Sequence, residues 1–507
     1  MLLRKRSFLF FLVLMILLSG CQSLPALPGH VQQQRGKADV RLAAVFNDHM
    51  VLQRNKAIPI WGTAKPGQLV EVWLDSGFPK EISETKIQKK TVVRYAKALA
   101  DEDGKWRLKL GEHEAGGPFT LTVKGEQAIA YSDVLIGEVW LCSGQSNMVW
   151  SLRKTTNAKQ AMSLANYPQI RIMDVARVPS PHPVKDVKIA KSWTAVTPDS
   201  IKNFSAVGYY FGRAIHQEVG VPVGLILSAW GGTRVEPWMT PEVFNSNAEL
   251  AKAGRYQSPT AQTKTNRQAA TQLYNGMIEP LVPYGIRGVI WYQGESNRGQ
   301  YYDYEKLFTG LIHSWRSRWN DGRLPFYFAQ LAPYNYGRSD PRALPMLYDA
   351  QLRTHKKTKY TGMAVLTDIG NTKNIHPRNK LDVGNRLARW ALVRVYGKQN
   401  ITVSGPLYKS FKIRGDKIRV IFDYAQQGLI SSDGKGLTHF TIAGSDRVFH
   451  PAVAKMDGLS VIVSSAKVRK PVAVRFCFHD EAVPNFFNQA KLPASPFRTD
   501  DWPLKKK

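Results

Sequence analysis

The chain has 507 residues, 43% of them hydrophobic, with 70 lysines and arginines against 39 aspartates and glutamates, a formal net charge of +31. This length and apolar content exclude a small or disordered protein and predict two or three domains. The basic residues are scattered, without a basic helix or a basic motif interleaved with aromatic residues, so the composition does not indicate nucleic acid as a partner.

The first 20 residues have the pattern of a cleaved export signal. The charged segment Arg4-Lys5-Arg6 precedes an apolar stretch, residues 7–18, that is too short for a comfortable membrane span. The sequence Leu18-Ser19-Gly20-Cys21 resembles a bacterial lipobox, which implies acylation of Cys21 as the first mature residue. Gln22 then favours, by analogy, the outer membrane over the inner one. We therefore expect a signal peptide (1–20), a Gln- and Pro-rich tether (21–38), and an exported protein, either lipid-anchored in the cell envelope or periplasmic.

Short strands separated by turn residues such as Asp103-Gly104 follow the tether, and they predict an N-terminal β domain over residues 39–130. The strands with the clearest patterns are Ala57–Gly62, Leu69–Leu74, Trp106–Leu110 and Phe119–Val123. The short apolar runs indicate antiparallel pairing between neighbours in the chain.

Apolar strands alternate with helical stretches between residues 131 and 400, which predicts a parallel α/β sheet. The expected strands are Val134–Cys142, Gly224–Ala229, Gly288–Tyr292, Phe326–Leu331 and Met363–Thr367, and the expected helices include Ser205–Val219 and Lys380–Tyr396. From residue 401 strands dominate again, as in Lys417–Phe422 and Val472–Phe476, and they predict a C-terminal β domain over residues 401–507.

Two cysteines remain besides Cys21, and each lies in an apolar stretch. Cys142 and Cys477 are therefore expected to be buried free thiols. No group of cysteines and histidines has the spacing of a zinc site, so neither a metal nor another cofactor is indicated.

Polar groups follow three of the apolar runs, at Gly144-Gln145-Ser146-Asn147, at Gln293-Gly294-Glu295-Ser296-Asn297 and at Asn374-Ile375-His376-Pro377. Because active sites of open α/β sheets gather beyond the carboxyl ends of the strands, we expect these groups to form one site.

Ser146 is the candidate nucleophile, and His376, in a loop before a helix, is the candidate base that removes its proton. An oxyanion that forms on an acyl substrate needs fixed donors. The candidates are the backbone amide of Ser146, the turn at Gly231-Gly232, with Gly232 preferred, and the side-chain amide of Gln293.

These motifs resemble the sialate O-acetylesterase family of SGNH hydrolases. The resemblance lies in Trp140–Met148, Trp230–Thr233, Trp291–Asn297 and Asn374–Pro377, and in the flanking segments Met50–Arg54, Ala115–Pro118 and Ser495–Asp500. It implies a flavodoxin-like three-layer α/β/α domain between two β domains. It also implies removal of O-acetyl groups from sugars, with Ser146 as nucleophile and His376 as base.

One position departs from the related pattern, in which an aspartate stands three residues before the catalytic histidine. Lys373 occupies that position and cannot orient His376. Asp368 and Glu295, which follow apolar strands, are the two candidates for the orienting acid. The third alternative is a Ser–His dyad assisted by a carbonyl group.

For the sugar, Arg234 is a candidate partner of a sialate carboxylate, and the rings of Trp238 and Tyr292 are candidate stacking surfaces. The sequence leaves two other functions open: an esterase for acetylated plant polysaccharide such as xylan, and a surface protein that binds sugars without turnover. It does not indicate the oligomeric state.

Overall fold

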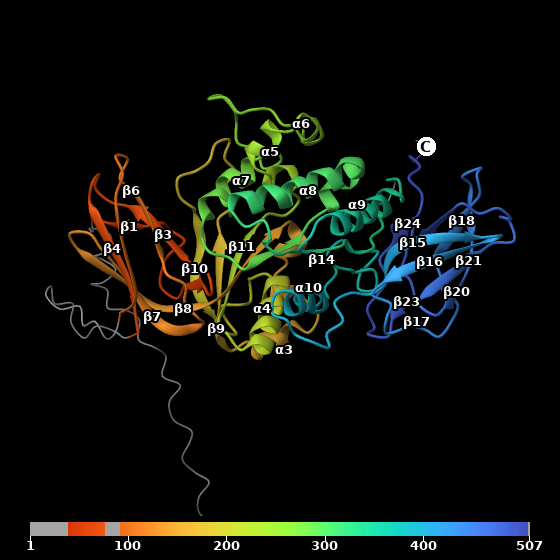
Figure 1. Ribbon diagram of the computed structural model, residues 1–507, viewed down its shortest axis with the longest axis horizontal. Coiled ribbons are helices and arrows are strands. Elements are labelled where there is room, and N and C mark those ends of the chain that lie inside the picture. The colour runs from red at the N-terminus through yellow and green to blue at the C-terminus, as the bar shows by residue number, and fades with distance from the viewer. Residues whose placement is uncertain (1–38, 77–91, 338, 505–507) are drawn as a thin grey trace, which may run out of the picture.

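The structure is a computed structural model that describes residues 39–76, 92–337 and 339–504. The predicted signal peptide, the lipidation site Cys21 and the tether lie outside these residues. Figure 1 shows three parts in a row: an N-terminal β part, a central part with helices and strands, and a C-terminal β part. Among the described residues, no helix combines the length and the apolar character that a membrane crossing requires.

The N-terminal part consists of short, mostly antiparallel strands, as the sequence predicted. In β6 (Lys105–Leu110) exposed and buried residues alternate along the whole strand, so that one face packs on the core and the other meets solvent. The other strands are β1 (Arg41–Leu42), β2 (Val51–Gln53), β3 (Ile58–Thr63), β4 (Leu69–Asp75), β5 (Val92–Leu99) and β7 (Gly116–Lys124).

A single long strand, β8 (Ala128–Gly144), connects this part to the central one. Its first half pairs antiparallel with β7, and its second half pairs in parallel with the central strands β11 (Val223–Ala229) and β12 (Gly288–Tyr292). The domain boundary expected between residues 130 and 131 therefore falls inside a strand.

The central sheet has the order β10-β9-β11-β8-β12-β13-β14. Neighbouring strands pair in parallel along this order from β9 to β14, and β10 pairs antiparallel with β9 at the edge of the sheet. The remaining bounds are β9 (Tyr167–Val175), β10 (Ile189–Val196), β13 (Phe326–Ala329) and β14 (Thr361–Ala364). The mixed α/β class is thus confirmed, although β13 and β14 end two and three residues earlier than the sequence predicted.

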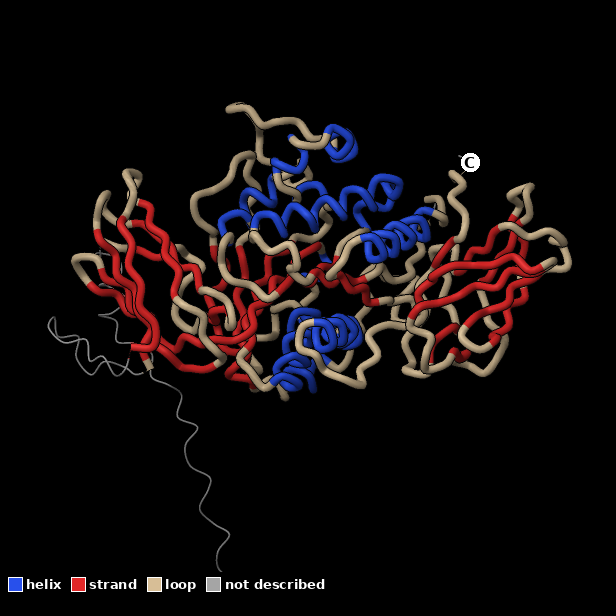
Figure 2. Tube along the Cα trace, in the orientation of Figure 1, coloured by secondary structure: helices blue, strands red, loops and turns tan. Residues whose placement is uncertain are grey.

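Helices lie on both sides of the central sheet (Figure 2). On one side α4 (Ala206–Val219) packs against α10 (Leu381–Arg394), both within a residue or two of their predicted bounds. Ser205 caps α4 by accepting a hydrogen bond from the amide of Gly208 (3.0 Å). On the other side lie α8 (Tyr301–Arg318) and α9 (Ala343–Lys357). The shorter helices are α2 (Ser146–Val149), α3 (Ala158–Ser163), α5 (Pro241–Asn245), α6 (Ala248–Gly254) and α7 (Gln272–Met277).

The C-terminal part contains two four-stranded sheets, β15-β16-β21-β20 and β19-β18-β22-β24, and the pair β17-β23. Phenylalanine rings form much of the core between them, with Phe422 and Phe497 in contact at 5.7 Å between centroids. The strands are β15 (Leu407–Arg414), β16 (Lys417–Asp423), β17 (Leu429–Ser431), β18 (Phe440–Ala443), β19 (Phe449–Pro451), β20 (Val453–Asp457), β21 (Ser460–Ser464), β22 (Ala473–Phe476), β23 (Phe486–Asn488) and β24 (Phe497–Arg498). Cys142 and Cys477 are buried free thiols, as expected.

Candidate active site

The site is built where three adjacent strands end together. The register places Ala229 of β11 and Tyr292 of β12 beside Gly144, the last residue of β8. Gly144 has φ +129°, and a Cβ there would lie 2.2 Å from the carbonyl oxygen of Tyr292, so only glycine fits. This close approach lets α2 begin directly at Ser146, above the edge of the sheet.

Ser146 and His376 are hydrogen-bonded, with 2.8 Å between the serine Oγ and the histidine Nε2. His376 lies in the loop between β14 and α10, where its backbone amide donates to Asn374 Oδ1 (2.9 Å). Its half-buried ring stacks on Trp150, with centroids 4.8 Å apart and planes 15° apart. The two residues that the sequence nominated as nucleophile and base thus lie within reach of a direct proton transfer.

The surroundings of His376 favour its neutral form. Burial, and then the charges of Lys380 and Lys154, hold the pKa of the imidazole below its ordinary value. A neutral imidazole can accept the proton of Ser146, and a protonated one cannot, so the lowered pKa extends the pH range in which the base is available.

Neither candidate acid is bonded to His376 in the part of the chain that the structure describes. Both carboxylate oxygens of Asp368 are taken by the guanidinium of Arg386, each at 2.6 Å. Glu295 is directed to Asn147, whose Nδ2 donates to Oε1 (2.6 Å). Glu295 Oε2 is buried and has no hydrogen-bond partner among the described residues. Since neither carboxylate bonds to the imidazole, the geometry does not support either of them as the acid that orients it.

Three buried side chains beneath Ser146 form a network that the sequence did not reveal. Lys380 Nζ donates to Asn147 Oδ1 (2.5 Å), and Asn147 Nδ2 donates to Glu295 and to the carbonyl oxygen of Ile375 (3.1 Å). The sequence offered Asn147 only as part of a motif and Lys380 only as the start of a helix. No local pattern indicates that a lysine at a helix start turns inward.

The glycine turn after β11 lies against the nucleophile, as expected for an oxyanion donor. A Cβ at Gly231 would lie 3.3 Å from the Cβ of Ser146. The amide of Trp230 donates to Gly144 O (3.1 Å), and Gln268 Nε2 donates to Gly232 O (2.6 Å), so both ends of the turn are fixed. Gly232 itself has φ +72°, a conformation in which glycine is favoured.

Gln293 is not available as a free donor in this geometry, contrary to the expectation from the sequence. The side chain is fully buried, and its Nε2 donates to Asn297 Oδ1 (2.7 Å) and to Thr233 O (3.2 Å). Its Oε1 accepts from the hydroxyl of Tyr304 (2.9 Å). Gln293 instead fixes the segment that follows the glycine turn.

The two expected stacking residues are core residues. Trp238 and Tyr292 are both 0% exposed, and Trp238 Nε1 donates to Thr233 Oγ1 (3.1 Å), so neither ring faces a bound sugar. The partly exposed rings beside Ser146 are those of Trp150 and Trp230, and the guanidinium of Arg267 lies 5.8 Å from the Trp230 ring.

Arg234 lies beyond the glycine turn, where it lines a pocket of about 400 Å³ together with Arg255. Its guanidinium donates to Gln268 O at 3.4 Å. The side-chain amide of Gln300 donates to Glu236 Oε1 (3.1 Å) and accepts from Arg255 Nη2 (3.2 Å), and the buried Glu236 interacts electrostatically with both arginines. The lining residues in the described chain are otherwise neutral, without an aspartate or a glutamate. This pocket is therefore suited to an anionic group.

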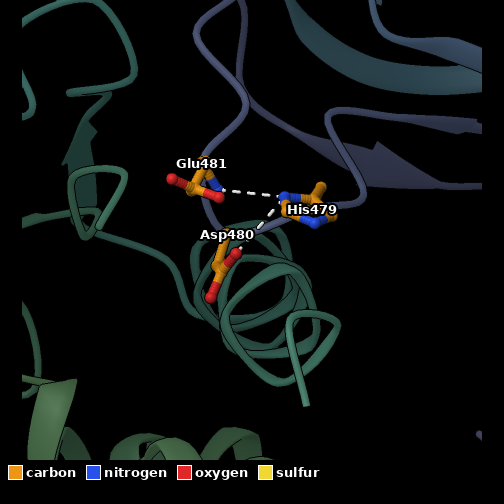
Figure 3. Close-up of side chains that lie close together, drawn as sticks. All are labelled: His479, Asp480 and Glu481. Carbon is orange, nitrogen blue, oxygen red and sulfur yellow. Dashed lines mark hydrogen bonds and ion pairs between the residues drawn. The ribbon is translucent and has the colours of Figure 1, made fainter. Parts of the chain in front are cut away.

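The C-terminal part reaches toward the central part through the loop that carries His479, Asp480 and Glu481 (Figure 3). Asp480 accepts from the amides of Tyr336 (3.3 Å, at Oδ2) and Tyr334 (2.9 Å, at its backbone oxygen). The ring of Tyr336 in turn lies 4.0 Å from the guanidinium of Arg298, three residues after Glu295. The three groups in Figure 3 lie close enough to hold an ion, but Asp480 is already engaged in this anchor.

Residues 136–392 match a family described as carbohydrate esterase, sialic acid-specific acetylesterase, and this segment contains Ser146 and His376. The human sialate O-acetylesterase is 30% identical over 90% of this chain and 92% of its own length. The mouse sialate O-acetylesterase is 29% identical over 76% of this chain and 79% of its own. A crystal structure of a carbohydrate acetylesterase from Xanthomonas citri is similar with a TM-score of 0.81 and 36% identity, covering 91% of this chain and 100% of that one.

Proposed function

Because the chain belongs to the sialic acid-specific acetylesterase family and is a carboxylic ester hydrolase of the sialate O-acetylesterase type, we propose that it removes O-acetyl groups from sialic acids through an acetyl-enzyme on Ser146. The observation that carries this proposal is the 2.8 Å hydrogen bond between Ser146 Oγ and His376 Nε2, inside the segment that matches the family. The parallel sheet with helices on both sides fits the SGNH-hydrolase architecture that the sequence motifs resemble.

The reaction is a two-step acyl transfer. Ser146 attacks the acetyl carbonyl carbon while His376 takes its proton, and the negative charge develops on the carbonyl oxygen. The backbone amides of Ser146 and Gly232 are the donors proposed for that oxygen, since Gly231, the residue before Gly232, lies against Ser146. The bond between the acetyl carbon and the sugar oxygen then breaks, and His376 gives its proton to that oxygen, so that the sugar leaves as an alcohol. In the second step His376 takes a proton from a water that attacks the acetyl carbon, and it returns the proton to Ser146 as the ester bond to Ser146 breaks and acetate leaves.

His376 performs this without a carboxylate partner in the arrangement described above, so we propose a Ser–His dyad. Stacking on Trp150 and the anchoring of its backbone to Asn374 fix the imidazole. The sequence left open a dyad assisted by a carbonyl group, and among the described residues no carbonyl oxygen bonds to the imidazole, so the proposed dyad is held by stacking instead.

An acidic sugar is favoured over neutral xylan by the pocket beyond the glycine turn, whose charged lining residues in the described chain are Arg234 and Arg255. The test is acetate release by the wild-type enzyme from acetylated sialic acid and from acetylated xylan, with Ser146→Ala as the blank. Faster release from xylan contradicts the sialate assignment. If the wild type releases acetate from neither substrate faster than Ser146→Ala does, the esterase activity is contradicted, and a protein that binds sugars without turnover remains.

Replacing Arg234 by alanine is expected to raise KM for acetylated sialic acid about tenfold or more, because a charge-assisted pair with the carboxylate is lost. The value of kcat should change little, since Arg234 is proposed to bind the carboxylate and does not contact Ser146 or His376 in the described structure. Steady-state kinetics with 4-nitrophenyl acetate, which has no carboxylate, is the control. An equal rise in KM for both substrates contradicts this role.

We further propose that the protein is exported and anchored by lipid at Cys21, on the basis of the charged and apolar segments that precede the lipobox-like sequence. Mass spectrometry of the N-terminal peptide from the membrane fraction of a bacterial host should show an acylated Cys21. Cys21→Ser should abolish the modification. An unmodified Cys21 in the mature wild-type protein contradicts the anchor and leaves a periplasmic location.

A further inference from the structure

Lys380 is a completely buried lysine at the floor of the candidate active site. Its side chain is 0% exposed, and its ammonium group lies 5.4 Å from the ring of Tyr292 and 6.0 Å from the ring of Trp150. In the described part of the chain its one hydrogen-bond acceptor is Asn147 Oδ1, at 2.5 Å. Burial of a lysine costs free energy unless the charge is compensated, so its place beneath a nucleophile calls for a functional explanation.

Lys380 and Glu295 favour one orientation of the Asn147 amide when both are charged. An ammonium group can only donate and an ionised carboxylate can only accept, so Oδ1 then faces Lys380 and Nδ2 faces Glu295. Burial raises the pKa of Glu295, and the carbonyl oxygen of Ile375, which can only accept, supports the same orientation of Nδ2. A reversed amide would place donor against donor and acceptor against acceptor.

This orientation joins the two catalytic segments. Asn147 follows Ser146 directly in α2, and its Nδ2 also donates to the carbonyl oxygen of Ile375, the residue before His376. The amide therefore ties the helix that carries the nucleophile to the loop that carries the base, next to the 2.8 Å contact between Ser146 and His376.

We propose that Lys380 is a positioning residue of the esterase, which acts through Asn147 to hold Ser146 and His376 at hydrogen-bonding distance. The proposal rests on the function proposed above, and it adds a residue that does not touch the substrate. The side chain of Glu295 completes the arrangement as the acceptor on the far side of the Asn147 amide.

The charge of Lys380 also acts on His376. The charged group that acts on Lys380 is Glu295, from the segment after β12. The imidazole of His376 feels the charges of Lys380 and of Lys154, whose ammonium group lies 5.2 Å from the Trp150 ring. Burial lowers the pKa of Lys380 to about 7, against the opposing effect of Glu295. Below that pH Lys380 is charged, and it disfavours the protonated form of His376. Removing the charge should therefore raise the pKa of His376 and shift the acid limb of kcat/KM to higher pH.

A double-mutant cycle tests the proposal. Lys380→Met and Asn147→Ala are each expected to lower kcat for 4-nitrophenyl acetate by on the order of 100-fold, because a small displacement of the reacting groups has effects of this size. The double variant should be little slower than the slower single variant, because Lys380 acts through Asn147. The acid limb of kcat/KM for Lys380→Met should lie at higher pH than that of the wild type.

Lys154→Met is the matched control, since Lys154 also lowers the pKa of His376 but does not contact Asn147. It should shift the acid limb in the same direction and leave kcat at its plateau nearly unchanged. Thermal unfolding and far-UV circular dichroism, measured on every variant, separate a local displacement of the reacting groups from loss of the fold. If Lys380→Met does not fold, Asn147→Ala still tests the link between Ser146 and His376.

The proposal is overturned if folded Lys380→Met has the same kcat as Lys154→Met, or if the losses of the two single variants multiply in the double variant. If folded Asn147→Ala retains wild-type kcat, the proposal is overturned as well. Failure of the proposed esterase function is distinguishable from failure of the Lys380 proposal, because in the first case the wild type itself releases acetate no faster than Ser146→Ala.

Discussion

Ser146→Ala is expected to lower kcat for acetate release by roughly 10⁴- to 10⁶-fold, with little change in KM. The hydroxyl that forms the acetyl-enzyme is lost, while the glycine turn and the substrate pocket remain. His376→Ala should cause a loss of similar order, because without the base the serine stays an unreactive alcohol. The double variant should be little slower than either single one, since the two groups act as a unit. Coupled acetate detection under single-turnover and steady-state conditions measures all three.

Ser143→Ala is the matched control for this experiment. Ser143 lies three residues earlier at the end of the same strand, fully buried, and its hydroxyl has no hydrogen-bond partner among the described residues. Its removal should leave turnover close to that of the wild type. Substantial activity in Ser146→Ala, or a comparable loss of activity in Ser143→Ala, would show that Ser146 is not the nucleophile.

Glu138→Gln is expected to lower the free energy of unfolding by about 3–5 kcal/mol, which is the usual cost of breaking a buried ionic network from one side. Glu138 is fully buried in β8, and its carboxylate accepts from Arg54 Nε (2.5 Å), Arg287 Nε (2.6 Å) and the hydroxyl of Tyr396 (3.0 Å). The neutral amide would leave two largely buried guanidinium groups without a counter-charge. Equilibrium unfolding in urea, followed by tryptophan fluorescence, measures the difference.

Glu249→Gln provides the comparison, because Glu249 pairs with Lys306 on the exposed side of the central part. Its loss should be small beside that of Glu138, since solvent screens an exposed pair. Equal effects of the two substitutions would show that the Glu138 network does not stabilise the fold.

The sequence predicted what depends on local pattern. Continuous apolar runs identified β8, β11 and β12, and the polar groups that follow strands identified Ser146 and His376, because parallel strands bring their ends to one edge. Strands β9 and β10 and helices α8 and α9 were not predicted. The strands lack a continuous apolar run, but the buried residues of α8 do have the 3.6-residue spacing that indicates a helix, so the sequence contained this signal.

The errors at the site come from partners that are distant in the chain. Asp368 pairs with Arg386 from α10, and Gln293 bonds to Thr233, sixty residues away in the chain. Trp238 was expected to face a sugar because it follows the glycine turn, but it lies in the core. A polar or aromatic residue that follows a strand is a candidate site residue, but only the fold determines whether its side chain faces the cleft or the interior.

The long strand β8 has a mechanical consequence. It runs from the N-terminal part to Gly144 without a loop, and its partner changes from β7 over residues 128–136 to β11 and β12 over residues 138–144. The strand is irregular at Asp133, which has φ +53°, and its pairing with β7 contains register shifts. The ladders on both sides of residues 138–144 therefore hold the end of β8 from which Ser146 follows, while the same backbone continues into the N-terminal part.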